Sequence, residues 1–326
     1  MTNYRQNASI NYKMMNPTIS IIIPIRNEIK HIERSVKSAM LLTDQVFVVD
    51  SNSTDGSVEL AESLGAKVYQ YDWTEDSNFS TKINWALNTI PFITPWVMRL
   101  DADEYLMDNA IKGICESLKK VPDDVNGITL IRRIYFLGRW MKHSNEYPKT
   151  SLRIFRVGKC RMESRWLDEH VDVGDGKAID FPFDIVDDSR INLATWINKH
   201  NNDYSIKEAI ELINDEIGLF DRKENNLDAN ANKKKKIKEK YVSMPKYWRC
   251  FFWFLYREFF KMGFLDGKEG FLWNFFQGWW YRTLADAKVE EIYKACGKDK
   301  IKISSYIYDN YKIDISNLIS IESKVI

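Results

Sequence analysis

The sequence lacks long apolar runs, closely spaced cysteines and any excess of charge. No stretch of about 18 consecutive apolar residues occurs in the 326 residues, so we expect no helix that crosses a membrane. The four cysteines (115, 160, 250 and 296) lie far apart without a Cys-X-X-Cys pair, which disfavours a zinc ribbon or a disulfide framework and fits a reducing compartment. The formal net charge of +1 predicts no general attraction to nucleic acid.

Two phosphate-binding sequences are also missing. No Gly-X-Gly-X-X-Gly follows the first apolar run, which disfavours a dinucleotide site of the usual kind. No Gly-X-X-X-X-Gly-Lys-Ser/Thr occurs either, which excludes a P-loop enzyme. We therefore expect any bound nucleotide to be held by carboxylates and a metal ion.

Residues 17–105 alternate between β-branched apolar runs and helical segments. The expected strands are residues 19–24, 46–50, 67–72 and 96–103. This alternation predicts an α/β fold with a parallel sheet and right-handed crossovers, in which ligands bind beyond the carboxyl ends of the strands. The polar residues at those ends are Asn27, Glu28, Asp50, Asp101 and Asp103. One crevice is expected to gather them.

The chain is organised around the segment from Trp96 to Tyr105, which begins as an apolar strand and ends in three carboxylates. If the strand continues, Asp101 and Asp103 point to the same side. Two carboxylates arranged in this way hold Mg²⁺ or Mn²⁺, with substrate phosphates completing the coordination shell. A solvated acidic turn is the alternative. The preceding apolar strand, and Asp50 at the end of an earlier one, favour the metal site.

Several motifs resemble those of family 2 glycosyltransferases with the GT-A fold. These are residues 24–28 (PIRNE), 48–56 (VVDSNSTDG) and 101–104 (DADE). Later segments resemble the branch that adds sugars to the lipopolysaccharide inner core, and these are residues 133–140, 168–171, 196–201 and 263–270. The resemblance covers about residues 18–285. One departure is Ser51, because many relatives carry a second aspartate there.

The resemblance implies roles for the strand-end residues. Asp50 would accept hydrogen bonds from the uracil or the ribose. Asp101 and Asp103 would hold the metal that neutralises the departing diphosphate. The donor nucleotide would be contacted by Pro24, Asn27, Glu28, Asp50, Ser51 and Asp101.

An inverting transfer also needs a carboxylate that takes the proton from the acceptor hydroxyl. Asp168 and Glu169 point to opposite faces if the chain is extended, so only one of them faces the crevice. We favour Glu169 by its position in the motif and keep Asp168 as the alternative; a surface acidic turn is the third reading. His170 is expected to complete the metal shell, to orient the base, or simply to be hydrogen-bonded.

The middle of the chain is rich in arginine. We expect Arg133, Arg139 and Arg153, with Trp140, to contact the diphosphate or the acceptor, because guanidinium groups match phosphate oxygens and an indole ring stacks on sugars. A solvated sheet edge and a core tryptophan are the alternatives.

Residues 205–326 are expected to form a helical region. Ser205 and Glu208 have the spacing of a capping box. Further on, an aromatic helix places six side chains, Tyr256 among them, on one face and Lys246, Arg257 and Lys261 on the other. The other five of the six are the expected membrane contacts: Trp248, Phe251, Phe252, Leu255 and Phe259. Such a helix suits the interface of an anionic membrane, and a helical subdomain packed on the catalytic core is the alternative.

The expected organisation is therefore a polar tail (1–16), a GT-A catalytic domain (17–204, with halves 17–105 and 106–204) and a C-terminal helical, membrane-associating region (205–326). The predicted function is inverting, metal-dependent transfer of glucose or another hexose from a UDP-sugar to a lipid-linked or lipopolysaccharide (lipooligosaccharide) core saccharide. The predicted location is the inner face of the cytoplasmic membrane. No nucleic acid is expected among the partners. The alternatives are a sugar-phosphate nucleotidyltransferase, which would normally carry a glycine-rich loop, and a non-catalytic membrane-binding scaffold.

Overall fold

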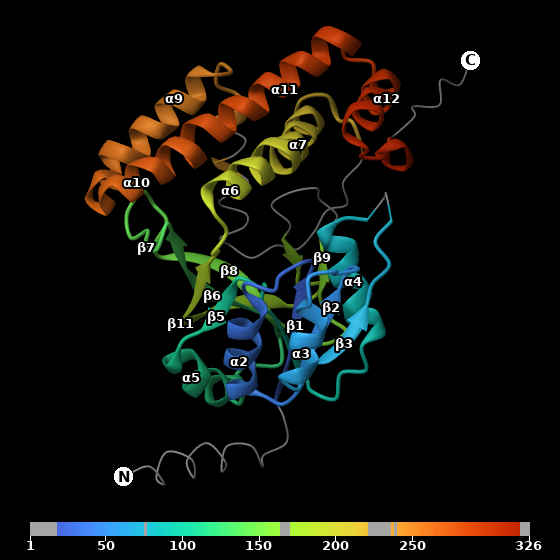
Figure 1. The fold of residues 1–326 in the computed structure, drawn as a ribbon, viewed down its shortest axis with the longest axis vertical. Coiled ribbons are helices and arrows are strands. Elements are labelled where there is room, and N and C mark those ends of the chain that lie inside the picture. Colours follow the sequence, from blue (N-terminus) through green and yellow to red (C-terminus); the bar gives the residue numbers. More distant parts are fainter. Residues whose placement is uncertain (1–17, 75–76, 164–169, 221–235, 238–239, 320–326) are drawn as a thin grey trace.

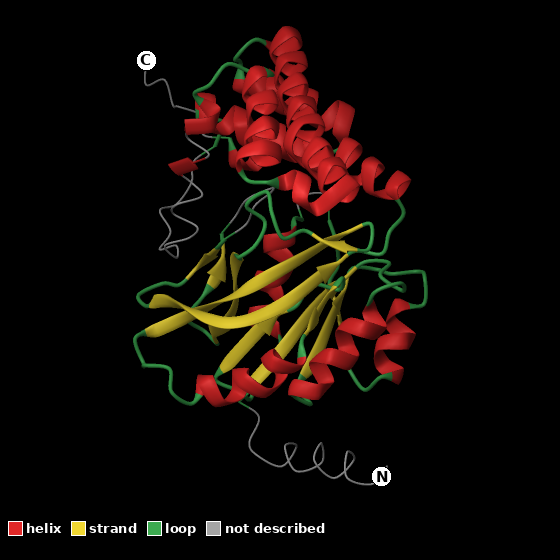
Figure 2. Cartoon of the chain, turned by 90° about the vertical axis from the view of Figure 1, so that its left-hand side faces the viewer, coloured by secondary structure: helices red, strands yellow, loops and turns green. Residues whose placement is uncertain are grey.

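The computed structural model describes residues 18–74, 77–163, 170–220, 236–237 and 240–319. A nine-stranded sheet flanked by helices forms one part, and a layer of helices lies across one end of it (Figures 1 and 2). The strand order is β3-β2-β1-β4-β8-β6-β11-β5, with β7 paired to β6. The strands of this sheet are β1 (Ile19–Ile25), β2 (Val46–Asp50), β3 (Lys67–Gln70), β4 (Trp96–Arg99), β5 (Glu104–Leu106), β6 (Val125–Phe136), β7 (Arg139–Trp140), β8 (Lys149–Arg156) and β11 (Lys177–Asp188). A separate antiparallel pair consists of β9 (Arg161–Met162) and β10 (Val171–Asp172).

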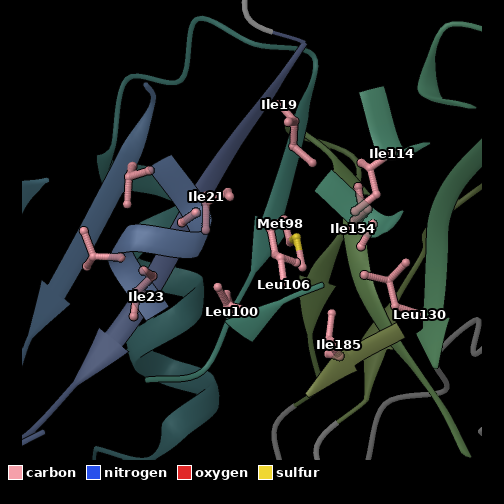
Figure 3. Close-up of a cluster of buried hydrophobic side chains, with 14 of the residues drawn as sticks. Ile19, Ile21, Ile23, Met98, Leu100, Leu106, Ile114, Leu130, Ile154 and Ile185 are labelled. Atoms are coloured by element: carbon pink, nitrogen blue, oxygen red, sulfur yellow. The ribbon is translucent and has the colours of Figure 1, made fainter. Parts of the chain in front are cut away.

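The first half of the sheet is parallel, and helices cover both of its faces. Helices α2 (Ile32–Leu42), α3 (Ser57–Ser63) and α5 (Asp108–Leu118) pack on one face, and α4 (Phe79–Thr89) packs on the other. Every residue of β1 and β2 is buried, which is why all of their residues except Ser20 and Asp50 are apolar. Figure 3 shows Ile19, Ile21 and Ile23 of β1 within a core that Ile114 of α5 shares.

The second half of the sheet is mixed. Strand β8 lies antiparallel between β4 and β6, β11 runs parallel to β6, and β5 closes the edge antiparallel to β11. The predicted α/β class with a C-terminal helical region is confirmed. The predicted parallel arrangement applies to β1–β4, which carry the candidate site.

The helical layer begins at Leu193, whereas the sequence placed the start of the helical region at residue 205. Its elements are α6 (Leu193–Lys199), η2 (His200–Tyr204), α7 (Ser205–Ile217), α9 (Trp248–Leu255), η3 (Tyr256–Phe260), η4 (Gly263–Asp266), α10 (Gly267–Trp273), η5 (Asn274–Trp280), α11 (Tyr281–Cys296), α12 (Lys300–Tyr311) and η6 (Ser316–Leu318). The predicted capping box at Ser205 is wrong, because this residue continues a helix that is already formed and its hydroxyl donates to the carbonyl of Asn201 (2.7 Å). None of the described helices combines the length and the apolar character needed to cross a membrane.

The helical layer is attached to the sheet by an aromatic cluster and by a buried ionic network. At the end of β6, the ring of Phe136 lies 5.7 Å from that of Trp196 and 5.2 Å from that of Trp273. In the loop before β8, the buried Glu146 accepts hydrogen bonds from Arg257 and from Nε1 of Trp273. Burial raises the pKa of Glu146, but the charges of Lys149 and Arg257 outweigh this effect and hold it at about 2.

We expect Glu146→Gln to destabilise the protein, because it leaves the buried Arg257 without its carboxylate. Removing one partner of a buried ion pair typically costs about 3–5 kcal/mol. The lowered pKa means that this contribution is complete above pH 4.5 and is lost as the pH falls toward 2. Urea unfolding is therefore expected to show a large difference between the two proteins at pH 7 and a smaller one at pH 3. Glu116→Gln, at an exposed Glu–Lys pair, is the matched control and should not move the midpoint. An equal difference at both pH values would contradict the assignment.

Candidate active site

The loops that follow β1 and β2 are braced against each other. The backbone N–H of Asn27 donates to Oγ of Ser53 (2.8 Å), and its side-chain Oδ1 accepts from the N–H of Thr54 (2.8 Å). The N–H of Glu28 donates to Oγ of Ser57 (2.9 Å). Asn27 has a φ of 57°, a left-handed conformation that asparagine tolerates better than most residues. The two loops therefore form one polar rim at the carboxyl ends of β1 and β2.

The other predicted nucleotide contacts lie deeper. Asp50 is buried and accepts hydrogen bonds from the N–H (3.0 Å) and Oγ (2.5 Å) of Ser53. Pro24 lies within β1, opposite Val49 of β2. Ser51 is also buried, and its hydroxyl has no hydrogen-bond partner among the described residues. Asp50 thus shapes the loop that carries Ser53. Contact of these residues with the donor nucleotide remains a prediction.

Sequence analysis missed a buried cation beside this rim. Lys82, on α4, is buried and its Nζ donates to the carbonyl of Ile25 at the end of β1 (2.7 Å). Burial lowers the pKa of Lys82 to about 8, and the charges of Asp50 and Glu28 act in the opposite direction. The sequence did contain a signal for this burial: Lys82 lies next to Ile83 on the side of α4 that faces the core.

We expect the stability of the wild-type protein to rise with pH relative to Lys82→Met. The unfolded state holds the Lys82 proton up to about pH 10.5, whereas the folded state releases it above about pH 8. Between pH 7.5 and pH 10 this difference amounts to about 2 kcal/mol in favour of the wild type. Chemical unfolding of both proteins at the two pH values measures it, since other titrating groups are common to both. Parallel pH dependences would show that Lys82 keeps an ordinary pKa.

The carboxylate segment after β4 differs from its prediction in local structure. The strand ends at Arg99, residues 102 and 103 form a turn, and β5 begins at Glu104. The prediction that Asp101 and Asp103 share one face of a continuing strand is therefore wrong. The turn nevertheless brings both side chains to the same cavity. Glu104 points inward and is buried, where it accepts from the N–H of Asp101 (3.1 Å) and pairs with Arg153.

The two aspartates have different electrostatic surroundings. Asp101 lies 3.1 Å from Nη2 of Arg153, and its buried Oδ1 makes no hydrogen bond in the described part of the chain, although Nε of Arg99 is 3.3 Å away. Burial raises the pKa of Asp103 well above its ordinary value. The neighbouring Asp187, Asp101 and Glu28 raise it further, and Arg132 lowers it. An added cation would relieve the repulsion around Asp103.

These residues fit a hard divalent cation. Two carboxylates with an oxygen left unbonded are a common donor set for Mg²⁺ or Mn²⁺, whose remaining positions are filled by phosphate oxygens and water. Within residues 18–319, apart from the undescribed gaps, no group of three or more histidine, cysteine or acidic side chains is placed to hold a metal on its own. His170 lines the same cavity, but the structure does not group it with the aspartates as a third ligand.

A cavity of about 1730 Å³ lies between the carboxyl ends of the strands and the helical layer. Asp101 and Asp103 line one part of it, and Trp196, His200 and Tyr204 of the helical layer line another. Asp187, which sequence analysis also missed, lines it beside Arg132, with which it forms an ion pair. Its signal was weaker than that of Asp50: it stands near the end of β11, directly after the apolar pair Ile185 and Val186. The predicted bases Asp168 and Glu169 lie outside the described residues.

The predicted acceptor contacts do not line this cavity. Arg153 is fully buried against Glu104, and Arg133 is paired with Asp184. Arg139 donates to the carbonyl of Leu265 (3.3 Å). Trp140 lies beneath the cations of Arg133 (4.5 Å) and Lys142 (4.7 Å), so its ring is already in cation–π contact. Asp101, Asp103 and His170 thus line the cavity, whereas these four residues do not, although Arg153 contacts Asp101 from behind.

Comparisons with curated proteins find short matches to glycosyltransferases. An uncharacterised glycosyltransferase of Rickettsia conorii is 36% identical over 97 residues, which cover 29% of this chain and 32% of that protein. The lipopolysaccharide core biosynthesis glycosyltransferase LpsC of Rhizobium meliloti is 26% identical over 147 residues, which cover 44% of this chain and 53% of LpsC. The matched part of the chain thus spans about half of these relatives or less.

Solved structures also overlap with only part of the chain. Glucosyl-3-phosphoglycerate synthase from Mycobacterium tuberculosis, solved with Mn²⁺, UDP and glucosyl-3-phosphoglycerate, is 21% identical with a TM-score of 0.31. The overlap covers 36% of this chain and 45% of that one.

The family comparison reaches further along the chain. The model of glycosyl transferase family 2 matches residues 20–186, which is more than half of the sequence and includes β2–β10 and nearly all of β1 and β11. The matched region carries the strand-end aspartates and the sheet of the predicted GT-A fold. The chain therefore belongs to glycosyl transferase family 2.

Proposed function

We propose that the protein transfers glucose or another hexose, with inversion, from a UDP-sugar to a saccharide of the lipopolysaccharide core or another lipid-linked saccharide. The observation that carries this proposal is the convergence of Asp101 and Asp103 on a cavity that extends to the helical layer. A donor held at the aspartates leaves the rest of the cavity for an acceptor. The name of LpsC supports the acceptor class.

The donor end is formed by the rim of Asn27 and Glu28 and by the two aspartates. Mg²⁺ or Mn²⁺ held by Asp101 and Asp103 would neutralise the diphosphate as it leaves. Arg153 and Arg99 keep the carboxylate of Asp101 in place, and Lys82 supplies a positive charge beneath the loops. The protein's own part in this half-reaction is to position the diphosphate against the strand ends.

We assign removal of the proton from the acceptor hydroxyl to Glu169, with Asp168 as the alternative base. The flanking strands β9 and β10 are paired, and His170, the next residue in the sequence, lines the cavity. Single displacement needs only this base, because no covalent intermediate with the enzyme forms. The carboxylate takes the proton while the hydroxyl oxygen attacks the anomeric carbon and the bond to the diphosphate breaks.

The acceptor end is both aromatic and polar. Trp196 stacks on His200 (3.6 Å between ring centres), and His200 is hydrogen-bonded to Gln277 (2.9 Å). The charged residues that line the cavity are balanced in sign, for example Arg132 by Asp187 and Lys207 by Asp203. This balance favours a mainly neutral saccharide, which binds through hydrogen bonds and ring stacking, over a densely phosphorylated one.

A peripheral position on the inner face of the cytoplasmic membrane is also proposed. Among the five residues expected to contact the membrane, Trp248, Phe252 and Phe259 are exposed, and Phe251 and Leu255 are partly buried. The predicted cationic face is wrong in part, because Arg257 is buried against Glu146 and Lys246 lies near Glu216 and Glu290. Attraction to lipid must therefore come from other cations.

A donor screen tests the proposal. The purified protein is incubated with UDP-glucose, UDP-galactose or GDP-mannose, with Mg²⁺ or Mn²⁺, and with or without a deacylated core saccharide. We expect release of UDP that requires both the acceptor and the metal, together with a product one hexose larger by mass spectrometry. Formation of a nucleotide sugar from UTP and a sugar phosphate would instead establish a nucleotidyltransferase.

A further inference from the structure

Six large apolar side chains are exposed around the turn between η3 and α10, at the end of the helical layer that lies near β7 (Figure 1). We name them the corner surface: Phe259, Phe260, Met262, Phe264, Leu265 and Phe271. Phe260 is 77% exposed and Phe259 is 60% exposed. A contiguous group of exposed apolar side chains often marks a contact surface, whereas apolar side chains exposed singly are common on any protein.

The backbone of the corner is fixed on its inner side. Gly263 lies so close to the side chains of Ser144 and Asn274 that a Cβ atom there would collide with both. Asn274 in turn donates to Ser144 (2.7 Å) and to Glu258 (2.7 Å). Met262 has a φ of 56°, which is strained for a residue with a side chain. A turn anchored in this way cannot rotate its apolar side chains inward, so they stay at the surface.

The exposed charges around the corner are positive. The nearby carboxylates are withdrawn: Glu258 and Asp266 are buried, and Asp266 accepts hydrogen bonds from His143. Lys142 and Lys268 are exposed at the corner, and Lys261, which follows Phe260 directly, is partly buried. Lys268 lies 3.8 Å from Glu269, whose side chain is itself mostly buried. Aromatic side chains with lysines beside them match the interface of an anionic bilayer, where rings reach the acyl boundary and ammonium groups meet phosphates.

The corner also adjoins the cavity. Ser144, Arg257 and Trp273, which support the corner from inside, are part of the cavity lining. Leu137, on the turn before β7, lines the cavity and is half exposed. The next strand residue, Arg139, is hydrogen-bonded to the carbonyl of Leu265 in the corner itself. One end of the cavity therefore lies beside the corner surface.

We propose that the corner surface inserts into the interface of an anionic bilayer, and that this contact holds the adjacent end of the cavity against the membrane. The saccharide of a lipid-linked acceptor then reaches the aspartates while its lipid stays in the bilayer; this second part rests on the proposed function. The contact is centred on the corner and not on the start of α9. Trp248 lies about 18 Å from Phe260 along the α9–η3 helix, at 1.5 Å per residue.

Sedimentation of the full chain with vesicles tests the contact. Vesicles of phosphatidylcholine with 30% phosphatidylglycerol are compared with pure phosphatidylcholine vesicles at two salt concentrations. We expect the wild type to bind the anionic vesicles, and Phe260→Ser/Phe264→Ser to lower the partition coefficient about 100-fold, at roughly tenfold or more for each phenylalanine. Changing Lys261 and Lys268 to Gln should lower the partition coefficient about fivefold for each lysine at low salt and only slightly at high salt.

Leu41→Ser/Ile93→Ser is the matched control, since both side chains are exposed apolar residues on the catalytic domain. It should bind as the wild type does. Trp248→Ser/Phe252→Ser should lose less vesicle binding than the corner pair, Phe260→Ser/Phe264→Ser. Each variant is checked by its melting temperature, and Phe260→Glu gives a second corner variant that adds one charge at an exposed position.

Three outcomes would overturn the proposal. The first is a wild type that does not bind anionic vesicles, and the second is a corner pair that binds as tightly as the control pair. The third is a dimer in solution that the corner pair dissociates, which would assign the surface to a second copy of the chain. Transfer to a water-soluble acceptor separates the two proposals: the corner pair should keep it and lose only transfer to acceptor in vesicles. A wild type that binds vesicles but transfers to neither acceptor would reject the proposed function and leave the corner contact standing.

Discussion

Asp103→Asn is expected to abolish metal-dependent binding of the UDP-sugar and to leave the fold at least as stable as the wild type. The loss of transfer should be on the order of 10³-fold, because a metal ion supplies several kcal/mol of charge stabilisation to a departing diphosphate. Asparagine keeps the shape of the side chain. It removes the charge that Asp187, Asp101 and Glu28 repel.

The stability part of this prediction has a sign that can be checked. A buried acid with a raised pKa stabilises the fold below its unfolded pKa of 3.8, and this contribution is lost as the pH rises through the folded value. Without metal, the wild type should therefore lose stability relative to Asp103→Asn as the pH rises. Mg²⁺ or Mn²⁺ should raise the melting temperature of the wild type and leave that of the variant unchanged.

Asp103 is a cleaner probe than Asp101. Replacing Asp101 also removes a partner of the buried Arg153, so a loss of activity would be mixed with a loss of stability. Asp44→Asn, at an exposed aspartate before β2, is the control for a general charge effect. Calorimetry that finds the same metal-dependent affinity for UDP-glucose in Asp103→Asn would remove this residue from the site.

Glu169→Gln is expected to bind the donor almost normally and to lose transfer. Removing a general base typically costs about 10²- to 10⁴-fold in rate. The wild-type rate should fall as the pH drops through the pKa of the base, and this acid limb should be absent from the residual activity of the variant. Donor affinity is measured by calorimetry and transfer by the release of UDP.

Asp168→Asn is the matched comparison, because it removes the neighbouring carboxylate with the same change of shape. If Asp168→Asn loses transfer while Glu169→Gln stays active, the two roles must be exchanged. If both variants transfer normally, the base lies elsewhere, and Asp187 in the cavity lining becomes the next residue to test.

The parallel half of the sheet could be predicted from the sequence because its signals are local. The β-branched runs of β1 and β2 are continuous, as burial on both faces requires, and Asn78 caps α4 through the N–H of Thr81 (2.9 Å). The aspartates after β2 and β4 follow from the same pattern. Their convergence needs only that parallel strands end at one edge.

The pairing of charged residues could not be predicted in this way. Arg133 and Arg153 resembled ligands for phosphate in the sequence, but β11 supplies Asp184 to the first and the turn after β4 supplies Glu104 to the second. Arg257 resembled a lipid-facing cation, but Glu146, 111 residues earlier in the chain, neutralises it. A charge becomes available for binding only when no distant part of the chain neutralises it, and that is a property of the packed structure.

The sequence by itself determined the family, the α/β class and the strand ends at which the carboxylates gather, because each of these depends on short-range pattern. Only the tertiary structure decided that β4 stops at Arg99, that Lys82 is buried beneath the donor loops, and that the exposed apolar side chains include a rigid corner beside the cavity. The physical reason is that burial and ion pairing are set by contacts between residues far apart in the chain, which no local pattern records.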